Sequence, residues 1–137
     1  MPDPQRAQRG IIDTSVVIDL EHFEAGQLPI ELAVSAITMA ELAAGPHATE
    51  DTEERARRQD RLQRAEAAFD PLPFDGEAAR AYGRLYATEF ASGRKARGTR
   101  ALDLLIAATA CAANLPVYTR NPEDFRGLQG IVDVIAV

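Results

Sequence analysis

Residues 101–114 read ALDLLIAATACAAN, and the rest of the chain is organised around this stretch. It is long enough for a helix of several turns and apolar on every face, which is typical of a helix buried on all sides. Asp103 is the exception, because a buried carboxylate is unfavourable unless it is paired, hydrogen-bonded or bound to a cation. Ala107 and Ala110 follow on the same helix face, and their small side chains leave space beside the acid. A purely structural explanation also stands: an acid near a helix start favours the helix dipole, with Thr99 as the cap.

The bulk composition is that of one globular domain. The chain has 137 residues, 46% of them hydrophobic and 26% charged, with a formal net charge of −6. It contains no apolar run of a membrane span's length, no apolar core of a signal peptide, and one cysteine, Cys111, which we expect in the core. We therefore expect a single cytoplasmic domain over residues 1–137 that does not contact a membrane, with residues 1–9 as a flexible arm. The negative charge argues against a protein that coats nucleic acid, although it permits an enzyme that meets phosphate through metal ions.

Short apolar segments alternate with helical ones along the chain. Strands are expected at residues 10–12, 32–35, 72–74, 115–119 and 131–137, and helices from 14, over 38–44, 49–69, 75–91 and 101–114, and at 121–124. The proline at 73 makes the third strand the weakest of these, at an edge or a strand end. The helix over 75–91 is expected to pack through Ala78, Tyr82, Leu85, Tyr86 and Phe90. This alternation predicts an α/β fold with a mostly parallel sheet.

Four acids share one kind of position, after an apolar segment and in or near the start of a helix: Asp13, Glu41, Asp103 and Asp124. The carboxyl ends of the strands in an open parallel sheet face one crevice, where ligands bind. Three of these acids follow predicted strands, and Asp103 would reach the same end through its own helix. We therefore expect the four carboxylates to converge.

Each acid taken alone also has a structural explanation. Thr38 and Glu41 have the spacing of a capping box, and Asn121 and Asp124 have nearly the same form. Asp13 could simply accept a hydrogen bond from Thr14 or Ser15, one of which is expected to cap the next helix. These explanations do not account for convergence, because two carboxylates about 5 Å apart repel by roughly 3 kcal/mol at an effective dielectric near 20. A cation among them, or protonation of some, would relieve that repulsion.

Carboxylate ligands without histidine or cysteine favour a hard ion such as Mg²⁺ or Mn²⁺. The two histidines, His22 and His47, lie away from these segments, which argues against zinc. Such a cluster suits phosphodiester hydrolysis, in which metal ions activate a water and stabilise the charges on the oxygens. No Ser-His or Cys-His pair indicates covalent catalysis, and there is no Gly-rich phosphate loop. The basic run at Arg94, Lys95, Arg97 and Arg100 lies just before the central helix, and we expect it to meet substrate phosphates near Asp103, although a solvated loop remains an alternative.

The sequence resembles PIN-domain ribonucleases, and within that group the VapC toxins of bacterial toxin–antitoxin pairs. The matching segments are spread in order over almost the whole chain: Ile12-Asp13-Thr14-Ser15, Ile37-Thr-Met-Ala-Glu41-Leu42 with Gly45, Gly93-Arg94, Asp103-Leu-Leu-Ile-Ala-Ala-Thr-Ala110 and Thr119-Arg-Asn121-Pro-Glu-Asp124-Phe125. The resemblance implies a three-layer α/β/α PIN-like domain with strand order 3-2-1-4-5. It also implies Mg²⁺- or Mn²⁺-dependent cleavage of RNA, a homodimer, and a VapB-like antitoxin as partner.

The family's functional positions are carried over residue by residue. Asp13, Glu41, Asp103 and Asp124 match the acidic site, with Asp13, Asp103 and Asp124 as metal ligands. Thr14 and Thr119 match hydroxyl residues around it, and they join Asn121, Arg94 and Arg97 as candidate contacts to the substrate. Asn121 stands where many relatives have an acid, so either Asn121 or Asp124 completes the metal shell.

Two other functions compete with the nuclease. The first is a non-catalytic PIN scaffold that binds RNA or protein; scaffolds of that kind commonly lack some of the acids, and all four are present here. The second is a metal-dependent phosphatase or phosphodiesterase acting on small molecules, against which the basic run favours a polymer. A partner can also block a cluster of carboxylates by placing an arginine among them. We expect the rest of such a partner to lie in a groove along the helices that begin near Thr14 and Thr38.

Overall fold

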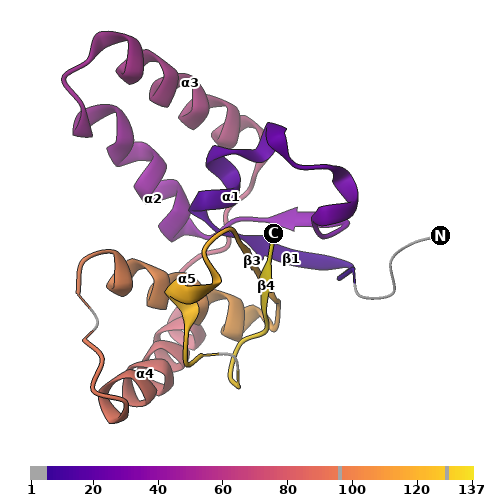
Figure 1. The fold of residues 1–137 in the computed structure, drawn as a ribbon, viewed down its shortest axis with the longest axis vertical. Helices are drawn as coiled ribbons and strands as arrows, with labels where there is room; N and C mark the ends of the chain where they lie inside the picture. Colours follow the sequence, from indigo (N-terminus) through magenta and orange to yellow (C-terminus); the bar gives the residue numbers. More distant parts are fainter. Residues whose placement is uncertain (1–5, 96, 129) are drawn as a thin grey trace.

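The computed structural model describes residues 6–95, 97–128 and 130–137, and within them it contains a four-stranded parallel sheet with helices on both faces (Figure 1). The strands lie in the order β2-β1-β3-β4 and are β1 (Arg9–Ile12), β2 (Glu31–Ala33), β3 (Val117–Thr119) and β4 (Val134–Ala136). One face carries α1 (Thr14–Ile18), α2 (Ala36–Ala44) and α3 (Thr52–Ala68), and the other carries α4 (Gly76–Ala91) and α5 (Thr99–Ala113). Short 3₁₀ turns η1 (Leu20–His22), η2 (Ala25–Gln27), η3 (Gly45–Ala48) and η4 (Pro122–Phe125) complete the described elements. The expected three-layer α/β/α architecture is confirmed.

The third expected strand, at residues 72–74, is reduced to one bridge. Leu72 pairs in parallel with Ser35, its N–H donating to the carbonyl of Val34 at 2.9 Å. Pro71 and Pro73 flank it and have no N–H to donate, so the pairing cannot extend. The described sheet has four strands in the order β2-β1-β3-β4, so the expected order 3-2-1-4-5 holds only without its third member. That member is reduced to the bridge between Leu72 and Ser35, two residues after β2 ends.

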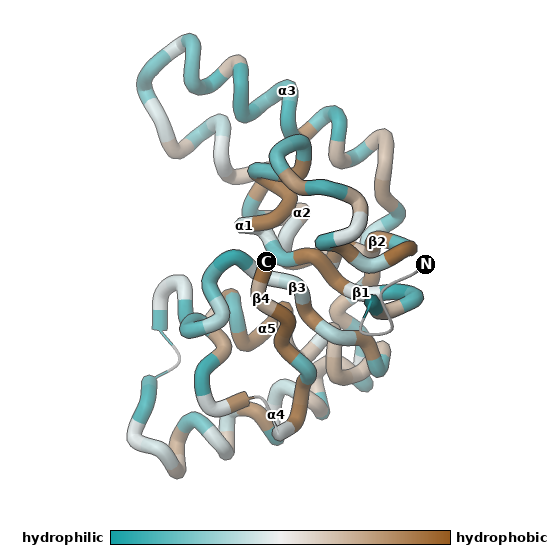
Figure 2. The backbone as a smooth tube through the Cα atoms, turned by 45° about the vertical axis from the view of Figure 1, so that its right-hand side comes forward, coloured by the Kyte–Doolittle hydropathy of each residue, from teal (hydrophilic) through white to brown (hydrophobic). Residues whose placement is uncertain are grey.

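The sheet is buried on both faces, which explains the unbroken apolar run of β1. Ile11 and Ile12 are both fully buried and point to opposite faces. Ile11 packs with residues of α4 and α5, whereas Ile12 packs with residues of α1, α2 and α3. Figure 2 shows the hydrophobic segments gathered around the strands and α1, while most of α3 is hydrophilic. The sheet therefore separates two hydrophobic cores, one on each face.

The helix predicted at residues 101–114 is α5, although it is not buried on every side. Its middle is sealed, with Leu104 and Ile106 to Ala110 all buried, but Leu102, Asp103 and Leu105 are partly exposed. It ends at Asn114, whose left-handed backbone (φ 57°) lets its N–H bond the carbonyls of Ala110 and Cys111. Cys111 is partly buried and packs against the core from its edge. Among the described residues, no helix is long and apolar enough to cross a membrane.

Two further expectations need correction. Residues 6–9 are not a flexible arm, because Arg6 Nε donates to the carbonyl of Leu28 at 2.7 Å and Arg9 begins β1; residues 1–5 lie outside the described chain. On α4, Tyr86 and Phe90 are exposed, and the buried residues are Ala78, Ala81, Leu85 and Glu89. The helix packs through small side chains, which allow a close approach to α5, and the large aromatic residues point outward. A carboxylate, Glu89, is thereby placed inside.

Candidate active site

The four acids converge at the carboxyl ends of the strands. Asp13 directly follows β1, Glu41 lies on α2 after β2, and Asp124 lies on η4 after β3. Asp103 reaches the same place from α5, where it lies beyond the first turn, so the helix-dipole explanation no longer accounts for it. The pKa of Asp103 is raised to about 7, first by burial and then by the negative charges of Asp124, Glu41 and Asp13. The four acids therefore lie close enough together for the charges of the other three to act on Asp103.

Asp13 is held by the start of α1. It is 5% exposed and occupies the N-cap, where its Oδ1 accepts hydrogen bonds from the Val16 N–H at 3.2 Å and from the Ser15 hydroxyl at 2.5 Å. The expectation that Thr14 or Ser15 caps this helix is wrong, because the acid itself is the cap. Burial raises the pKa of Asp13, and the hydroxyls of Ser15 and Thr119 oppose that rise by stabilising the ionised form.

Glu41 is free of the capping role that its spacing from Thr38 indicated. The N-cap of α2 is Ser35, whose hydroxyl accepts the Thr38 N–H at 3.1 Å, so no capping box forms. Instead, the Thr14 hydroxyl donates to Glu41 Oε1 at 2.8 Å, linking α1 to α2. Burial raises the pKa of Glu41, the Thr14 hydroxyl lowers it, and the charge of Asp13 raises it further. Glu41 is thus oriented toward the acid cluster.

The segment after β3 carries the fourth acid on a short turn. Asn121 is the N-cap of η4, but its side chain makes no capping bond; its N–H donates to Thr119 Oγ1 at 3.0 Å. Thr119 is fully buried, and its hydroxyl also bonds Asp13. Asp124 is exposed, and its negative charge raises the pKa of Asp103. Thr119 therefore ties η4 to the same carboxylate that β1 presents.

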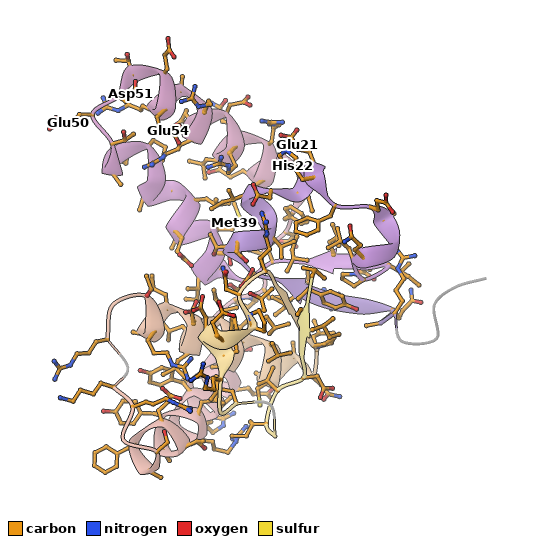
Figure 3. The ribbon with its side chains drawn as sticks, viewed as in Figure 1. Glu21, His22, Met39, Glu50, Asp51 and Glu54 are labelled. Atoms are coloured by element: carbon orange, nitrogen blue, oxygen red, sulfur yellow. The ribbon has the colours of Figure 1, made fainter. Side chains whose placement is uncertain are left out.

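The donors of this cluster suit a hard divalent cation in chemistry, since all of them are carboxylate oxygens. Their mutual repulsion, seen in the raised pKa of Asp103, is what a bound cation would relieve. Within the described ranges, no three acidic, histidine or cysteine side chains lie close enough together to hold a metal ion. His22 lies on η1 next to Asp19, well above α5 in Figure 3, and is not part of the cluster.

The basic run divides into two kinds of residue. Arg94 and Arg100 are used inside the protein: Arg94 Nη1 donates to the carbonyl of Arg126 at 2.7 Å, and Arg100 forms a bidentate pair with Glu89. Lys95 and Arg97 are exposed. Sequence reasoning missed Glu89 altogether. The available signal was its spacing from Leu85 and Ala78, which continues the buried face of α4 to a carboxylate.

Residues 11–130 match the family model for the PIN domain. The chain is 38% identical over 128 residues to the ribonuclease VapC5 of Mycobacterium tuberculosis, with 91% of each chain covered. It is 31% identical over 121 residues to a ribonuclease VapC of Rickettsia bellii, with 85% of this chain and 87% of that protein covered. The chain belongs to the VapC family of PIN domains.

A solved relative supports the fold of this PIN domain independently. The crystal structure of VapBC-5 from Mycobacterium tuberculosis, a member of the VapBC family of toxin–antitoxin systems, superposes with a TM-score of 0.83 at 37% identity. The match covers 95% of this chain and 99% of that one. This chain therefore shares its sheet and helices with the VapBC-5 structure over almost its whole length.

Proposed function

We propose that this chain is a ribonuclease toxin that cleaves phosphodiester bonds in RNA at the four-acid cluster, paired with a VapB-like antitoxin. One observation carries the proposal: Asp13, Glu41 and Asp124 follow β1, β2 and β3, and burial together with their charges raises the pKa of Asp103 on α5 to about 7. Such a destabilised cluster is more typical of a functional site than of a stabilising contact. The relatives named ribonuclease VapC, and the solved VapBC-5 toxin–antitoxin structure, support the same function.

The proposed cofactor is Mg²⁺, for which Mn²⁺ can substitute. When bound, it would supply the positive charge that polarises a phosphate oxygen and activates a water. Asp13, Asp103 and Asp124 are the residues proposed to hold it. Glu41, fixed by the Thr14 hydroxyl, is proposed to orient the attacking water and accept its proton at a carboxylate oxygen.

The substrate contacts are proposed from exposure and free hydrogen-bonding groups. Asn121 is exposed beside Asp124, and its side chain makes no capping bond, so it can reach a nucleotide. Arg97 and the adjacent Lys95 are exposed and suited to phosphates. Arg94 is a weaker candidate because its guanidinium already bonds the Arg126 carbonyl, and buried Thr119 fits a role in orienting Asp13 better than a role in touching RNA. A homodimer is also proposed, from the resemblance.

The test compares metal-dependent cleavage of an RNA pool with hydrolysis of a small phosphate ester. We expect the wild-type protein to cut RNA with Mg²⁺, and Asp13→Asn and Asp103→Asn to lose at least a hundredfold in rate while staying folded, because neutral amides are poor ligands for a hard cation. Asp70→Asn, an exposed acid between α3 and α4, is the matched control and should keep full activity. Binding of RNA without cleavage would indicate a scaffold, and hydrolysis of the ester alone would indicate a small-molecule enzyme.

A further inference from the structure

A buried carboxylate lies outside the acid cluster. Glu89 on α4 is 1% exposed, and a carboxylate taken out of water is strongly unfavourable unless its partner is well placed. Arg100, in the first turn of α5, supplies that partner: its Nε donates to Oε2 at 2.8 Å and its Nη2 to Oε1 at 2.5 Å. Arg94 adds a second cation, with Nη1 3.6 Å from Oε1. The paired arginines hold the pKa of Glu89 below its usual range, so it is charged.

The same two arginines also donate hydrogen bonds to η4, the turn that carries Asp124, and to the residue that follows it. Arg100 donates to the backbone carbonyl of Asp124 and, through Nη2, to that of Arg126 at 3.0 Å. Arg94 Nη1 donates to the carbonyl of Arg126 at 2.7 Å. The Arg100 guanidinium therefore links Glu89 to η4, and its bidentate pairing with the Glu89 carboxylate sets its orientation.

The chain after η4 is shaped to receive Arg94. Gly127 has a positive φ of 87°, a conformation that favours glycine, and a Cβ added there would collide with the Arg94 guanidinium. Arg100 lies three residues before Asp103, so the two are neighbours on α5. The Glu89–Arg100–Arg94 group thus connects α4, the helix that bears Asp103 and the turn that bears Asp124.

We propose that Glu89 is a positioning residue that acts through Arg100 to hold Asp124 against Asp103, and so sets the metal affinity of the acid cluster. The proposal rests on the proposed function, because it assumes that Asp103 and Asp124 share a divalent cation. Among the described residues, no three acidic, histidine or cysteine side chains lie close enough together to hold a metal ion. In this proposal, the separation of η4 from α5 sets whether Asp103 and Asp124 share one. Glu89 itself touches neither substrate nor metal.

The experiment measures Mn²⁺ binding to the whole protein by electron paramagnetic resonance, alongside urea unfolding in EDTA. Glu89→Gln keeps the size of the side chain but removes the charge, and it should weaken Mn²⁺ binding at least fivefold. Glu31→Gln is the control, because Glu31 also pairs with an arginine, Arg9 at 3.2 Å, and lies at the start of β2, at the opposite end of the strands from the acid cluster. Its Mn²⁺ affinity should change less than twofold.

A background lacking Asp124 separates positioning from general destabilisation. If Glu89 acts by placing Asp124, Glu89→Gln should cause no further loss of Mn²⁺ affinity in an Asp124→Ala protein. Arg100→Lys provides a second variant should Glu89→Gln not fold, since one ammonium cannot replace a fork that bonds a carboxylate and two carbonyls; it should also weaken Mn²⁺ binding at least fivefold. Wild-type affinity in these variants, or equal losses with and without Asp124, would overturn the positioning role. Absence of Mn²⁺ binding by the wild-type protein would instead overturn the proposed metal site.

Discussion

Asp103 makes the free energy of unfolding of the metal-free protein depend on pH. Its pKa is raised from 3.8 to about 7, so between these pH values the native protein retains a proton that the unfolded chain releases. Stability therefore falls as the pH rises through this window, and the loss is complete above about pH 7. Asp13 and Glu41, whose pKa values are also raised, act in the same direction.

We expect Asp103→Asn to remove this loss. In EDTA the variant should exceed the wild type in free energy of unfolding at pH 8 by on the order of 1–2 kcal/mol after allowance for solvent screening, and by much less near pH 4.5. Urea titrations at both pH values measure this difference. Mg²⁺ should raise the melting temperature of the wild type but not of Asp103→Asn, and the increase should be larger at pH 8 than at pH 6. A stability difference that is the same at both pH values would show that Asp103 does not titrate in this range.

The reach of sequence reasoning differs between residues of the same site. All four acids could be chosen because each follows an apolar segment in an alternating pattern, and the structure brings them together. Their caps could not, because Asp, Ser and Thr stand side by side at residues 13–15 and any of them can cap a helix. Glu89 could not be chosen either, since its partner Arg100 is 11 positions away and the pairing depends on how α4 packs against α5.

The same contrast holds at the scale of elements. Strong apolar runs predicted β1, β3 and α5, because a strand buried on two faces and a helix with a buried middle both give long apolar segments. Residues 72–74 and the buried face of α4 were harder to predict from the sequence. The length of a strand depends on its hydrogen bonds to adjacent strands, and the prolines on either side of Leu72 limit this segment to a single bridge. On α4, hydrophobicity favours Tyr86 and Phe90 for the interior, whereas close packing selects the smaller Ala78 and Ala81.

The turn η4 allows the open question about the fourth ligand to be tested. We expect Asp124→Ala to reduce cleavage at least tenfold more than Asn121→Ala, because only the former removes a negative ligand from the cluster. Asn121 makes no side-chain capping bond, so Asn121→Ala should change the free energy of unfolding by less than about 0.5 kcal/mol. Rates per folded molecule at saturating Mg²⁺ decide between them. Equal rates for Asp124→Ala and wild type would move the fourth ligand away from Asp124.

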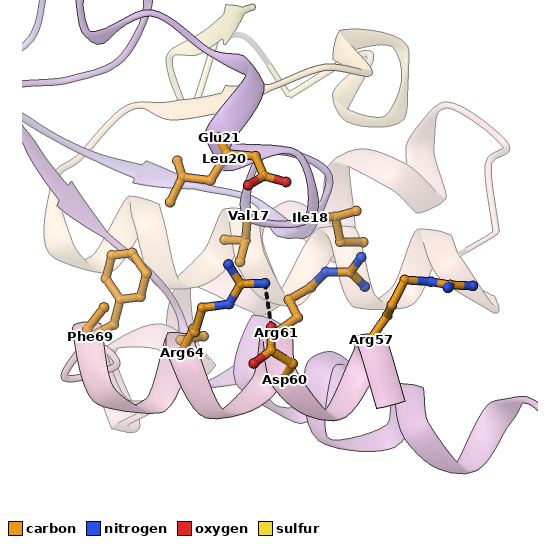
Figure 4. A pocket seen from close by; sticks show the side chains of 11 residues that line it. Val17, Ile18, Leu20, Glu21, Arg57, Asp60, Arg61, Arg64 and Phe69 are labelled. Carbon is orange, nitrogen blue, oxygen red and sulfur yellow. Dashed lines mark ion pairs between the residues drawn. The ribbon is translucent and has the colours of Figure 1, made fainter. Parts of the chain in front are cut away.

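At the scale of the whole molecule, a groove leads from the acid cluster along the helices of one face. A cavity of about 410 Å³ lies between α1 and α3, with Val17, Leu20 and Phe69 as apolar lining and Arg61 and Arg64 at its edge (Figure 4). A neighbouring cavity shares Ile18 and Arg61 with it and reaches Thr14 and Glu41, as well as residues of α2. The expected groove along α1 and α2 is thus formed along α1 mainly by α3, with α2 at the end near the acids.

This geometry fits a partner whose charges are opposite at its two ends. Arg64 pairs with Asp60 at 2.6 Å, but the groove edge remains rich in arginine, so an apolar helix bearing acidic residues would match it. The acid cluster at the other end calls for a cation. Arginine is suited to it, because its planar fork pairs with carboxylates in a bidentate way and stays charged.

We therefore expect the antitoxin to inhibit by placing an arginine among Asp13, Glu41, Asp103 and Asp124, in the space where Mg²⁺ is proposed to bind. Changing that arginine to alanine should restore RNA cleavage while the complex stays assembled, because the groove contacts are retained. Raising Mg²⁺ should weaken the wild-type complex modestly, by less than about tenfold in Kd, and should leave the alanine complex unaffected. Calorimetric titration of the toxin with each partner at two Mg²⁺ concentrations, with cleavage assays on the same samples, measures both effects. Inhibition that responds neither to Mg²⁺ nor to any arginine of the partner would refute competition for the carboxylates, and would leave simple covering of the groove as the cause of inhibition.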